Sequence, residues 1–146
     1  MAYAFPNKTP NDLNYGEIAV GNVYSFERVV DKDLVDRFAD LSGDYNPLHM
    51  DEKYAAVRSS GGRIVHGMLL ASFFSASVGM VCPGRRALYL SQELHFRNPV
   101  NVGQRVVIRG TVTAKSDAGR VITLAMEICD EKGSVCVDGE AKVKIL

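Results

Sequence analysis

The sequence predicts an α+β fold in which an antiparallel sheet wraps around one central helix that is apolar on every side. Two observations predict it. Residues 64–83 contain no Lys, Arg, Asp or Glu, so a helix formed there must be hidden inside the protein. Residues 87–145 hold extended stretches that are rich in β-branched residues and separated by turn sequences, a pattern typical of antiparallel strands. A twisted antiparallel sheet can bury such a helix by curving around it.

The chain begins with a segment that we interpret as a loose leader. Residues 1–16 are polar and carry the turn formers Pro6 and Pro10. The remaining residues, 17–146, are expected to form a single domain, because a chain of 146 residues fits one hydrophobic core.

Two helices are expected after a first strand over residues 23–30. Asp31 suits the N-cap of the first helix, and Gly43 is well placed to end it. Asn46 and Pro47 then suit the N-cap and first position of a second helix, expected over residues 47–57.

The later half of the chain predicts the buried helix and an antiparallel meander. The apolar helix is expected to begin near Gly67 and to end before Pro83. The extended stretches that follow are residues 87–97, 104–115, 120–130 and 134–145. This order of one strand, two helices, one apolar helix and four long strands is that of the hot-dog fold, which by itself does not determine a function.

Charge and cysteine usage narrow the class of protein. Lys plus Arg and Asp plus Glu number 17 each, so the formal net charge is zero and neither nucleic-acid nor anionic-membrane binding is expected. Residues 64–83 are interrupted by Ser, Gly and Pro, which does not favour a membrane span. The cysteines Cys82, Cys129 and Cys136 lack disulfide or zinc spacing, so we expect reduced thiols, no metal site and a cytoplasmic protein.

The first chemical motif is Asp44-Tyr-Asn-Pro-Leu-His49, at the entry to the second helix. We expect both the carboxylate and the imidazole to face one cavity. Such a pair can supply the base and the acid that the addition of water to a conjugated carbonyl requires. The alternative is an ordinary helix entry, in which Asp44 only caps backbone amides and His49 is exposed.

The second motif is His66-Gly67, where the apolar helix begins. A helix start presents free amide groups, and glycine lets a carbonyl oxygen approach them, so the Gly67 amide could stabilise an oxyanion. Turn geometry alone is the alternative for Gly67. We interpret His66 as a structural histidine among apolar neighbours. Ser75 lies two helical turns beyond Gly67, where its hydroxyl either meets a carboxylate or bonds back to its own helix.

A family resemblance joins these motifs. The segments 41–51 and 64–72, together with the loop 98–103, closely resemble the MaoC-like (R)-specific enoyl-CoA hydratases over about residues 18–146. The resemblance implies that Asp44 and His49 are catalytic, that the Gly67 amide holds the thioester carbonyl, and that Ser75 lies near the aspartate.

The implied activity is the reversible syn hydration of trans-2-enoyl-CoA to (R)-3-hydroxyacyl-CoA. The resemblance further implies no metal or redox cofactor, with CoA entering as part of the substrate. It implies a homodimer that binds acyl-CoA near the interface. Fatty-acid breakdown, polyhydroxyalkanoate supply and secondary metabolism all fit the product. A hot-dog thioesterase, a 3-hydroxyacyl-carrier-protein dehydratase and a non-catalytic acyl-CoA-binding subunit are the alternatives.

Overall fold

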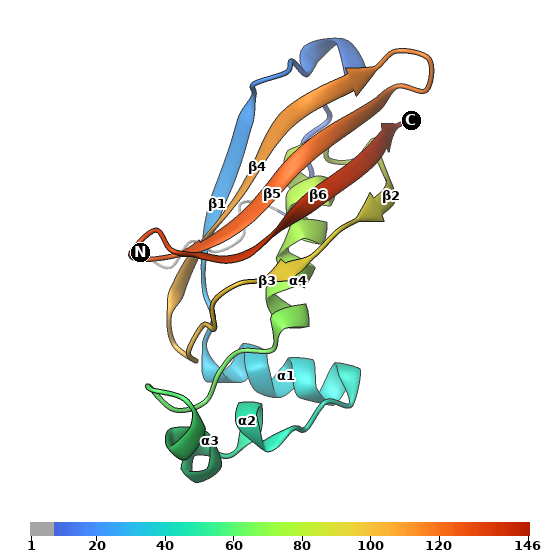
Figure 1. Cartoon of the computed structure of the whole chain (residues 1–146). Coiled ribbons are helices and arrows are strands. Elements are labelled where there is room, and N and C mark those ends of the chain that lie inside the picture. Colours follow the sequence, from blue (N-terminus) through green and yellow to red (C-terminus); the bar gives the residue numbers. More distant parts are fainter. Residues whose placement is uncertain (1–7) are drawn as a thin grey trace.

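A computed structural model describes residues 8–146 and confirms the hot-dog fold (Figure 1). A curved antiparallel sheet holds one helix, α4 (Gly67–Ala76), against its inner face. The helices α1 (Lys32–Ser42), α2 (Pro47–Met50) and α3 (Glu52–Arg58) form a separate layer beyond the N-terminal end of α4. The remaining elements are η1 (Tyr15–Glu17), η2 (Ser77–Val81), β1 (Val23–Val29), β2 (Ala87–Gln92), β3 (His95–Phe96), β4 (Arg105–Ser116), β5 (Val121–Asp130) and β6 (Val135–Ile145).

The strand order of the sheet is β1-β4-β5-β6-β2, with β3 also paired to β6. The expected meander is therefore correct for β4, β5 and β6 but wrong for residues 87–97. That stretch pairs with the last strand and not with the next one, because the loop after β3 carries the chain back to β4, beside β1. A register shift between Tyr89 and Ser91 and a break after Gln92 divide the stretch into two short strands. This arrangement places β3 beside the beginning of α4 (Figure 1).

Helix α4 buries one side against the sheet, whereas Met68, Ser72 and Ser75 on its other side are exposed, so the expected burial on every side is wrong for this chain. Leu69, Leu70, Phe73 and Phe74 are at most 5% exposed, and they belong to one core cluster with the inner residues of β4, β5 and β6. The helix continues as the π-helical turn η2 and ends before a cis peptide bond at Pro83. In residues 8–146, no helix has both the length and the apolar character needed to cross a membrane.

The leader interpretation is wrong for the part of residues 1–16 that follows Lys8 and approaches the core. Asn11 N donates to Met80 O at 2.9 Å, and Leu13 N donates to Pro83 O at 3.1 Å. Leu13 also packs against the core cluster. These backbone bonds fasten the segment across the end of α4 and η2, whereas residues 1–7 lie outside the described residues.

The helical layer follows the predicted caps with one correction. Asp31 accepts from Leu34 N at the start of α1, and Gly43 ends α1 in the left-handed conformation at φ 80°. The single helix expected over 47–57 is wrong, since α2 ends after one turn and α3 begins at Glu52. Asp51 causes the break: its extended backbone ends α2 while its side chain caps α3 by accepting from Tyr54 N.

Candidate active site

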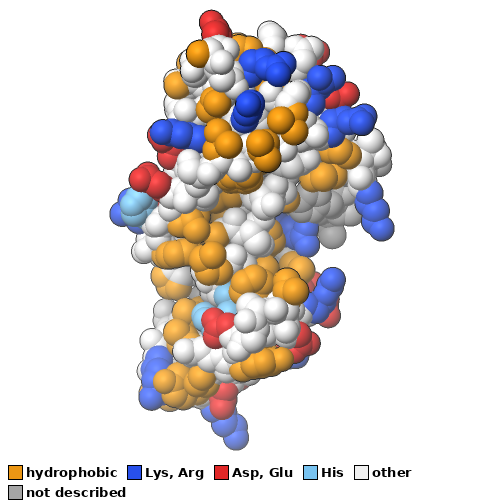
Figure 2. Space-filling model, turned by 90° about the vertical axis from the view of Figure 1, so that its right-hand side faces the viewer, with side chains coloured by type: hydrophobic (Ala, Val, Ile, Leu, Met, Phe, Trp, Pro, Cys, Tyr) orange, Lys and Arg blue, Asp and Glu red, His pale blue; other side chains and the backbone are white. Residues whose placement is uncertain are grey.

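The helical layer, the beginning of α4 and strand β3 enclose a cavity of about 440 Å³. Asp44, His49, His66 and Gly67 all line it. Histidine and acidic atoms lie together in the corresponding hollow in Figure 2. The prediction that both members of the first motif face one cavity with the start of the apolar helix is confirmed.

Asp44 is held by the turn between α1 and α2. Its Oδ1 accepts from Asn46 N at 3.1 Å, which is the capping contact of the alternative interpretation. Its Oδ2 remains free to face the cavity, and the side chain is 49% exposed. The carboxylate therefore uses one oxygen to fix the turn and offers the other to a bound molecule.

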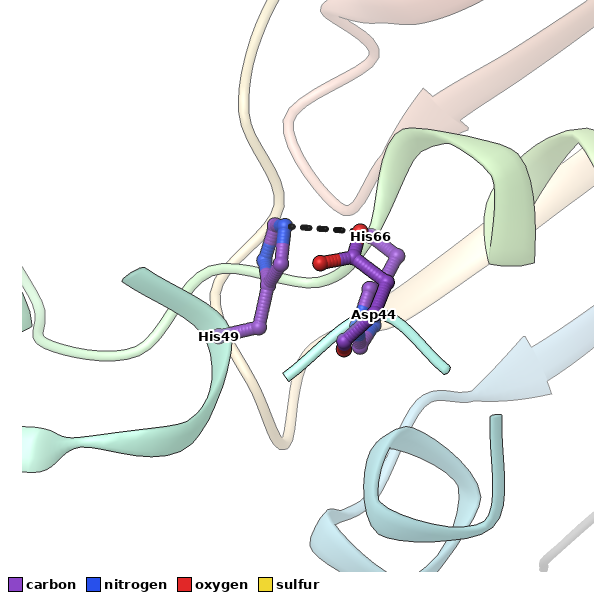
Figure 3. A group of neighbouring side chains, drawn as sticks. All are labelled: Asp44, His49 and His66. Carbon is purple, nitrogen blue, oxygen red and sulfur yellow. Dashed lines mark hydrogen bonds and ion pairs between the residues drawn. The ribbon is translucent and has the colours of Figure 1, made fainter. Parts of the chain in front are cut away.

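His49 lies on α2 with only 14% of its side chain exposed, so the exposed-histidine alternative is wrong. Its Nδ1 bonds to Ile64 O at 2.8 Å, and a carbonyl oxygen can only accept, so Nδ1 carries the proton. In the neutral ring the Nε2 lone pair then faces Asp44 Oδ2 across 4.0 Å (Figure 3). This gap is too long for a direct hydrogen bond, but one water molecule could bridge it.

His66 lies beside this pair and is 2% exposed. Its Nε2 donates to the main-chain carbonyl of Asp44 at 2.9 Å, and its ring stacks on His49 with centroids 3.9 Å apart. Its Nδ1 is buried without a hydrogen-bond partner among the described residues. Burial lowers the pKa of His66 below 6.5, and the neighbouring His49 acts in the same direction, so the neutral ring is favoured. The structural interpretation of His66 thus missed its contact with both members of the pair.

Gly67 begins α4 at a helix end that no side chain caps. Within the described chain nothing accepts a hydrogen bond from Gly67 N or Met68 N, which leaves two donors at the positive end of the helix dipole. The backbone of Gly67 does not need a positive φ, which rules out the turn-geometry alternative. A Cβ there would lie 2.8 Å from the Phe96 ring, so glycine permits the close approach of β3.

Ser75 is not brought to the pair within this chain. It is exposed on α4 and does not line the cavity. The back-bonding alternative is also not realised for Ser75, since it is Ser72 whose hydroxyl donates to Leu69 O, at 2.6 Å. A functional role for Ser75 stays a prediction.

Arg63, in the loop before α4, contributes to the site although neither sequence motif includes it. It is only 7% exposed, and its guanidinium donates to His49 O and, at 2.8 Å, to Asp36 Oδ1 of α1. Hydrogen bonds from Lys32 and from Arg63 lower the pKa of Asp36 below 3.8, which keeps the pair charged. In the sequence, the only sign of this buried role is a single arginine between two glycines and an apolar run.

A metal ion has one possible set of ligands among residues 8–146. One ligand atom from each of Asp44, His49 and His66 lies within 4.8 Å of the others. However, the two imidazoles are stacked with ring centroids 3.9 Å apart, so their in-plane lone pairs run alongside each other and not toward one common point. The arrangement therefore suits proton transfer better than metal binding.

The remaining walls of the cavity are mostly apolar. They include Leu70, Phe96 and Val137, together with the thiol of Cys136. Burial raises the pKa of Cys136 to about 11, so this thiol stays protonated at neutral pH and is not a nucleophile. Besides Asp44, His49 and His66, the lining includes the polar residues Arg97 and Asn98.

Fold and site together define a hot-dog protein with a carboxylate and an imidazole opposite the free amides of its central helix. Residues 17–129 match the model of the family described as MaoC like domain. The chain belongs to this family, which confirms the resemblance noted in the sequence.

Relatives with known names share most of the chain. The chain is 45% identical to the (R)-specific enoyl-CoA hydratase of Aeromonas caviae over 108 residues, which are 74% of this chain and 81% of that protein. It is 33% identical to a mitochondrial 3-hydroxyacyl-[acyl-carrier-protein] dehydratase of Arabidopsis thaliana, over 85% of this chain and 75% of that protein. The solved structure of the (R)-hydratase from A. caviae involved in PHA biosynthesis superposes with a TM-score of 0.85, covering 88% of this chain and 98% of that one at 40% identity.

Proposed function

We propose that this protein is a hydro-lyase that catalyses the reversible syn hydration of trans-2-enoyl-CoA to (R)-3-hydroxyacyl-CoA. The observation that carries the proposal is the 4.0 Å gap between Asp44 Oδ2 and His49 Nε2, in a cavity that also holds the Gly67 amide. The similarity to the A. caviae hydratase supports the same activity.

Asp44 and His49 hold the water and move its protons. A water in the gap donates one hydrogen to Asp44 Oδ2 and the other to His49 Nε2, so its oxygen lone pairs face the acyl chain. When this oxygen bonds to the β-carbon, one member of the pair takes the proton, and the pair then returns a proton to the α-carbon. Oxygen and hydrogen arrive from one side, which makes the addition syn, and the net change is the addition of one water.

The uncapped end of α4 is the third part of the mechanism. Attack at the β-carbon moves negative charge onto the thioester oxygen, and Gly67 N–H is proposed to donate to that oxygen. An amide that meets this charge lowers the barrier, and loss of one such donor typically costs about 2.7–4 kcal/mol.

Cofactor, partner and location follow from the same proposal. The reaction transfers no electrons overall, so it needs no redox cofactor, and the proton chemistry is assigned to side chains without a metal. CoA enters as part of the substrate. We further propose a cytoplasmic homodimer that serves fatty-acid or polyhydroxyalkanoate metabolism, the latter by analogy with the A. caviae (R)-hydratase.

The direct test is turnover of purified protein with crotonyl-CoA and longer enoyl-CoA substrates. Hydration removes the enoyl-thioester absorbance without releasing a thiol. Release of free CoA, detected with a thiol reagent, would instead identify a thioesterase. Tight acyl-CoA binding without loss of absorbance or thiol release would identify a binding subunit.

A 3-hydroxyacyl-carrier-protein dehydratase is the second candidate, and the similarity to the Arabidopsis dehydratase favours it. The chemistry at Asp44 and His49 would be the same, run in reverse, with the acyl group carried by a protein. Competition between CoA-linked and carrier-linked substrates of equal acyl length distinguishes the two, since the preferred carrier gives the higher kcat/KM.

A further inference from the structure

The two histidines at the cavity, His49 and His66, use their ring nitrogens differently. His49 presents a free Nε2 to the cavity, whereas His66 turns its Nε2–H toward the main-chain carbonyl of Asp44 at 2.9 Å. His66 therefore contacts Asp44 through the backbone and leaves its carboxylate free. The same imidazole stacks on His49, with ring centroids 3.9 Å apart and planes inclined by 30°.

We propose that His66 is a positioning residue, one buried imidazole that fixes both members of the catalytic pair relative to each other. The hydrogen bond fixes the position of the Asp44 main chain, and the stacking fixes the orientation of the His49 ring. Together they maintain the 4.0 Å gap in which the water is held. This inference rests on the proposed function, because the pair must act on one water for its spacing to matter.

The unpartnered Nδ1 of His66 argues against a role in packing alone. A buried polar atom without a partner destabilises the fold, and a phenyl ring would fill the same space without that cost. Phe38 already packs edge-on against the ring at 5.0 Å and would tolerate such a neighbour. The gain from histidine must therefore come from its Nε2–H, which a phenyl ring lacks.

The hydrogen bonds assign opposite tautomers to the two stacked histidines. Each ring donates to a carbonyl oxygen, His49 from Nδ1 to Ile64 O and His66 from Nε2 to Asp44 O. The reactive lone pair of His49 is thereby Nε2, on the side of Asp44 Oδ2. In His66 the lone pair at Nδ1 is buried and takes no part in the reaction.

The test uses two replacements that each keep one of the two contacts. His66→Phe keeps a ring to stack on His49 but has no donor, whereas His66→Gln keeps an N–H near the Nε2 position but has no ring. We expect His66→Phe to lower kcat by about 10- to 100-fold with little change in KM, because a small misplacement of the pair affects the reaction more than binding. His66→Gln should recover part of the lost kcat.

The matched control is His95→Phe. His95 lies on β3 outside the cavity lining, with its side chain 53% exposed and its Nδ1 3.4 Å from Asp138 Oδ1. This variant should keep the wild-type kcat. A His66→Phe enzyme that folds and keeps the wild-type kcat would overturn the inference.

A second measurement needs neither a variant that folds nor any turnover. The ¹⁵N chemical shifts of the histidine rings in the wild-type protein report which nitrogen carries the proton. We expect Nε2–H at His66 and Nδ1–H at His49, and a proton on Nδ1 of neutral His66 would overturn the inference. Failure of the proposed function is seen separately, as a wild-type protein that turns over no enoyl thioester.

Discussion

The sheet with α4 and the helical layer of residues 31–66 are stabilised in different ways. In β4 and β5 the inner side chains, such as Ile108 and Ile128, are completely buried in the core cluster that also holds the apolar side chains of α4. In the described helices α1, α2 and α3 the buried residues are Val35, Ala39 and Ala55 alone. The second region depends instead on caps and on polar side chains that reach backbone carbonyls.

Apolar burial stabilises the fold, whereas hydrogen bonds position the side chains of the cavity. Burial of apolar surface has no preferred direction, so it can hold a sheet around a helix but cannot place a carboxylate within a water's width of an imidazole. Hydrogen bonds are directional and can do so. Arg63 donates to the main-chain carbonyl of His49, and His66 donates to that of Asp44. Substitutions in the helical layer should therefore lower activity without unfolding the protein. Substitutions in the sheet or in α4 should first lower the free energy of unfolding.

The largest expected effect is on the reaction itself. Asp44→Asn keeps an oxygen that can accept from Asn46 N, and His49→Asn keeps an N–H near the Nδ1 position for Ile64 O. Each variant removes a proton acceptor at the gap, so we expect kcat to fall by about 10²- to 10⁴-fold. The melting temperature, measured by circular dichroism, should change little. Full activity in either folded variant would show that the assigned role is wrong.

A core substitution should give the opposite pattern. Leu124→Ala removes a side chain that is 2% exposed, and we expect it to lower the free energy of unfolding by about 2–5 kcal/mol. The kcat of the enzyme that remains folded should equal that of the wild type. Urea unfolding and activity measured on the same sample check both. If the alanine variant does not fold, Ile128→Val gives a milder version of the same test.

Gly67 lies where the helical layer meets α4. A pair of variants separates its role as an amide donor from its close contact with Phe96. Gly67→Ala places a Cβ 2.8 Å from the Phe96 ring, so we expect kcat/KM to fall by roughly tenfold as the ring and the end of α4 move apart. Phe96→Ala gives that Cβ room, so Gly67→Ala should reduce kcat/KM less in the Phe96→Ala background. An equal reduction in both backgrounds would show that steric contact with Phe96 is not the cause.

The expected caps and periodicities of single elements agree with the structure because they depend on neighbouring residues. Asp31, Gly43 and the apolar run of α4 act within one or two helical turns. The roles of Arg63 and His66 could not be predicted in this way, since their partners Asp36 and Asp44 are 27 and 22 residues away. The pairing of β2 and β3 with β6 was missed for the same reason.

Acid should destabilise the helical layer through His66. Its pKa is lowered in the folded protein by burial, while Asp44, His49 and Arg63 are the charged or titratable groups around it. As the pH falls through 6.5, His66 becomes protonated in the unfolded chain but stays neutral in the folded protein. The free energy of unfolding therefore decreases. Urea unfolding above and below this pH should show a smaller decrease for His66→Phe than for the wild type. An identical decrease would contradict the lowered pKa.

The smallest expected effect concerns a cap away from the cavity. Asp51→Ala removes the side chain that accepts from Tyr54 N at 3.0 Å, which should cost about 1 kcal/mol of stability. The matched control is Asp33→Ala, because Asp33 is exposed and forms only a 3.4 Å surface ion pair with Arg37. Thermal unfolding of both variants should rank Asp51→Ala as the less stable, and the reverse order would argue against the cap.

Stereochemistry tests the central claim most directly, namely that Asp44 and His49 deliver both parts of one water from the same side. Crotonyl-CoA is incubated with the wild-type enzyme in deuterium oxide, and the product is examined by NMR and with an (R)-specific dehydrogenase. We predict a single (R)-3-hydroxy product with deuterium at the α-carbon on the same side as the added oxygen. An (S) product, or deuterium distributed over both sides of the α-carbon, would contradict the account.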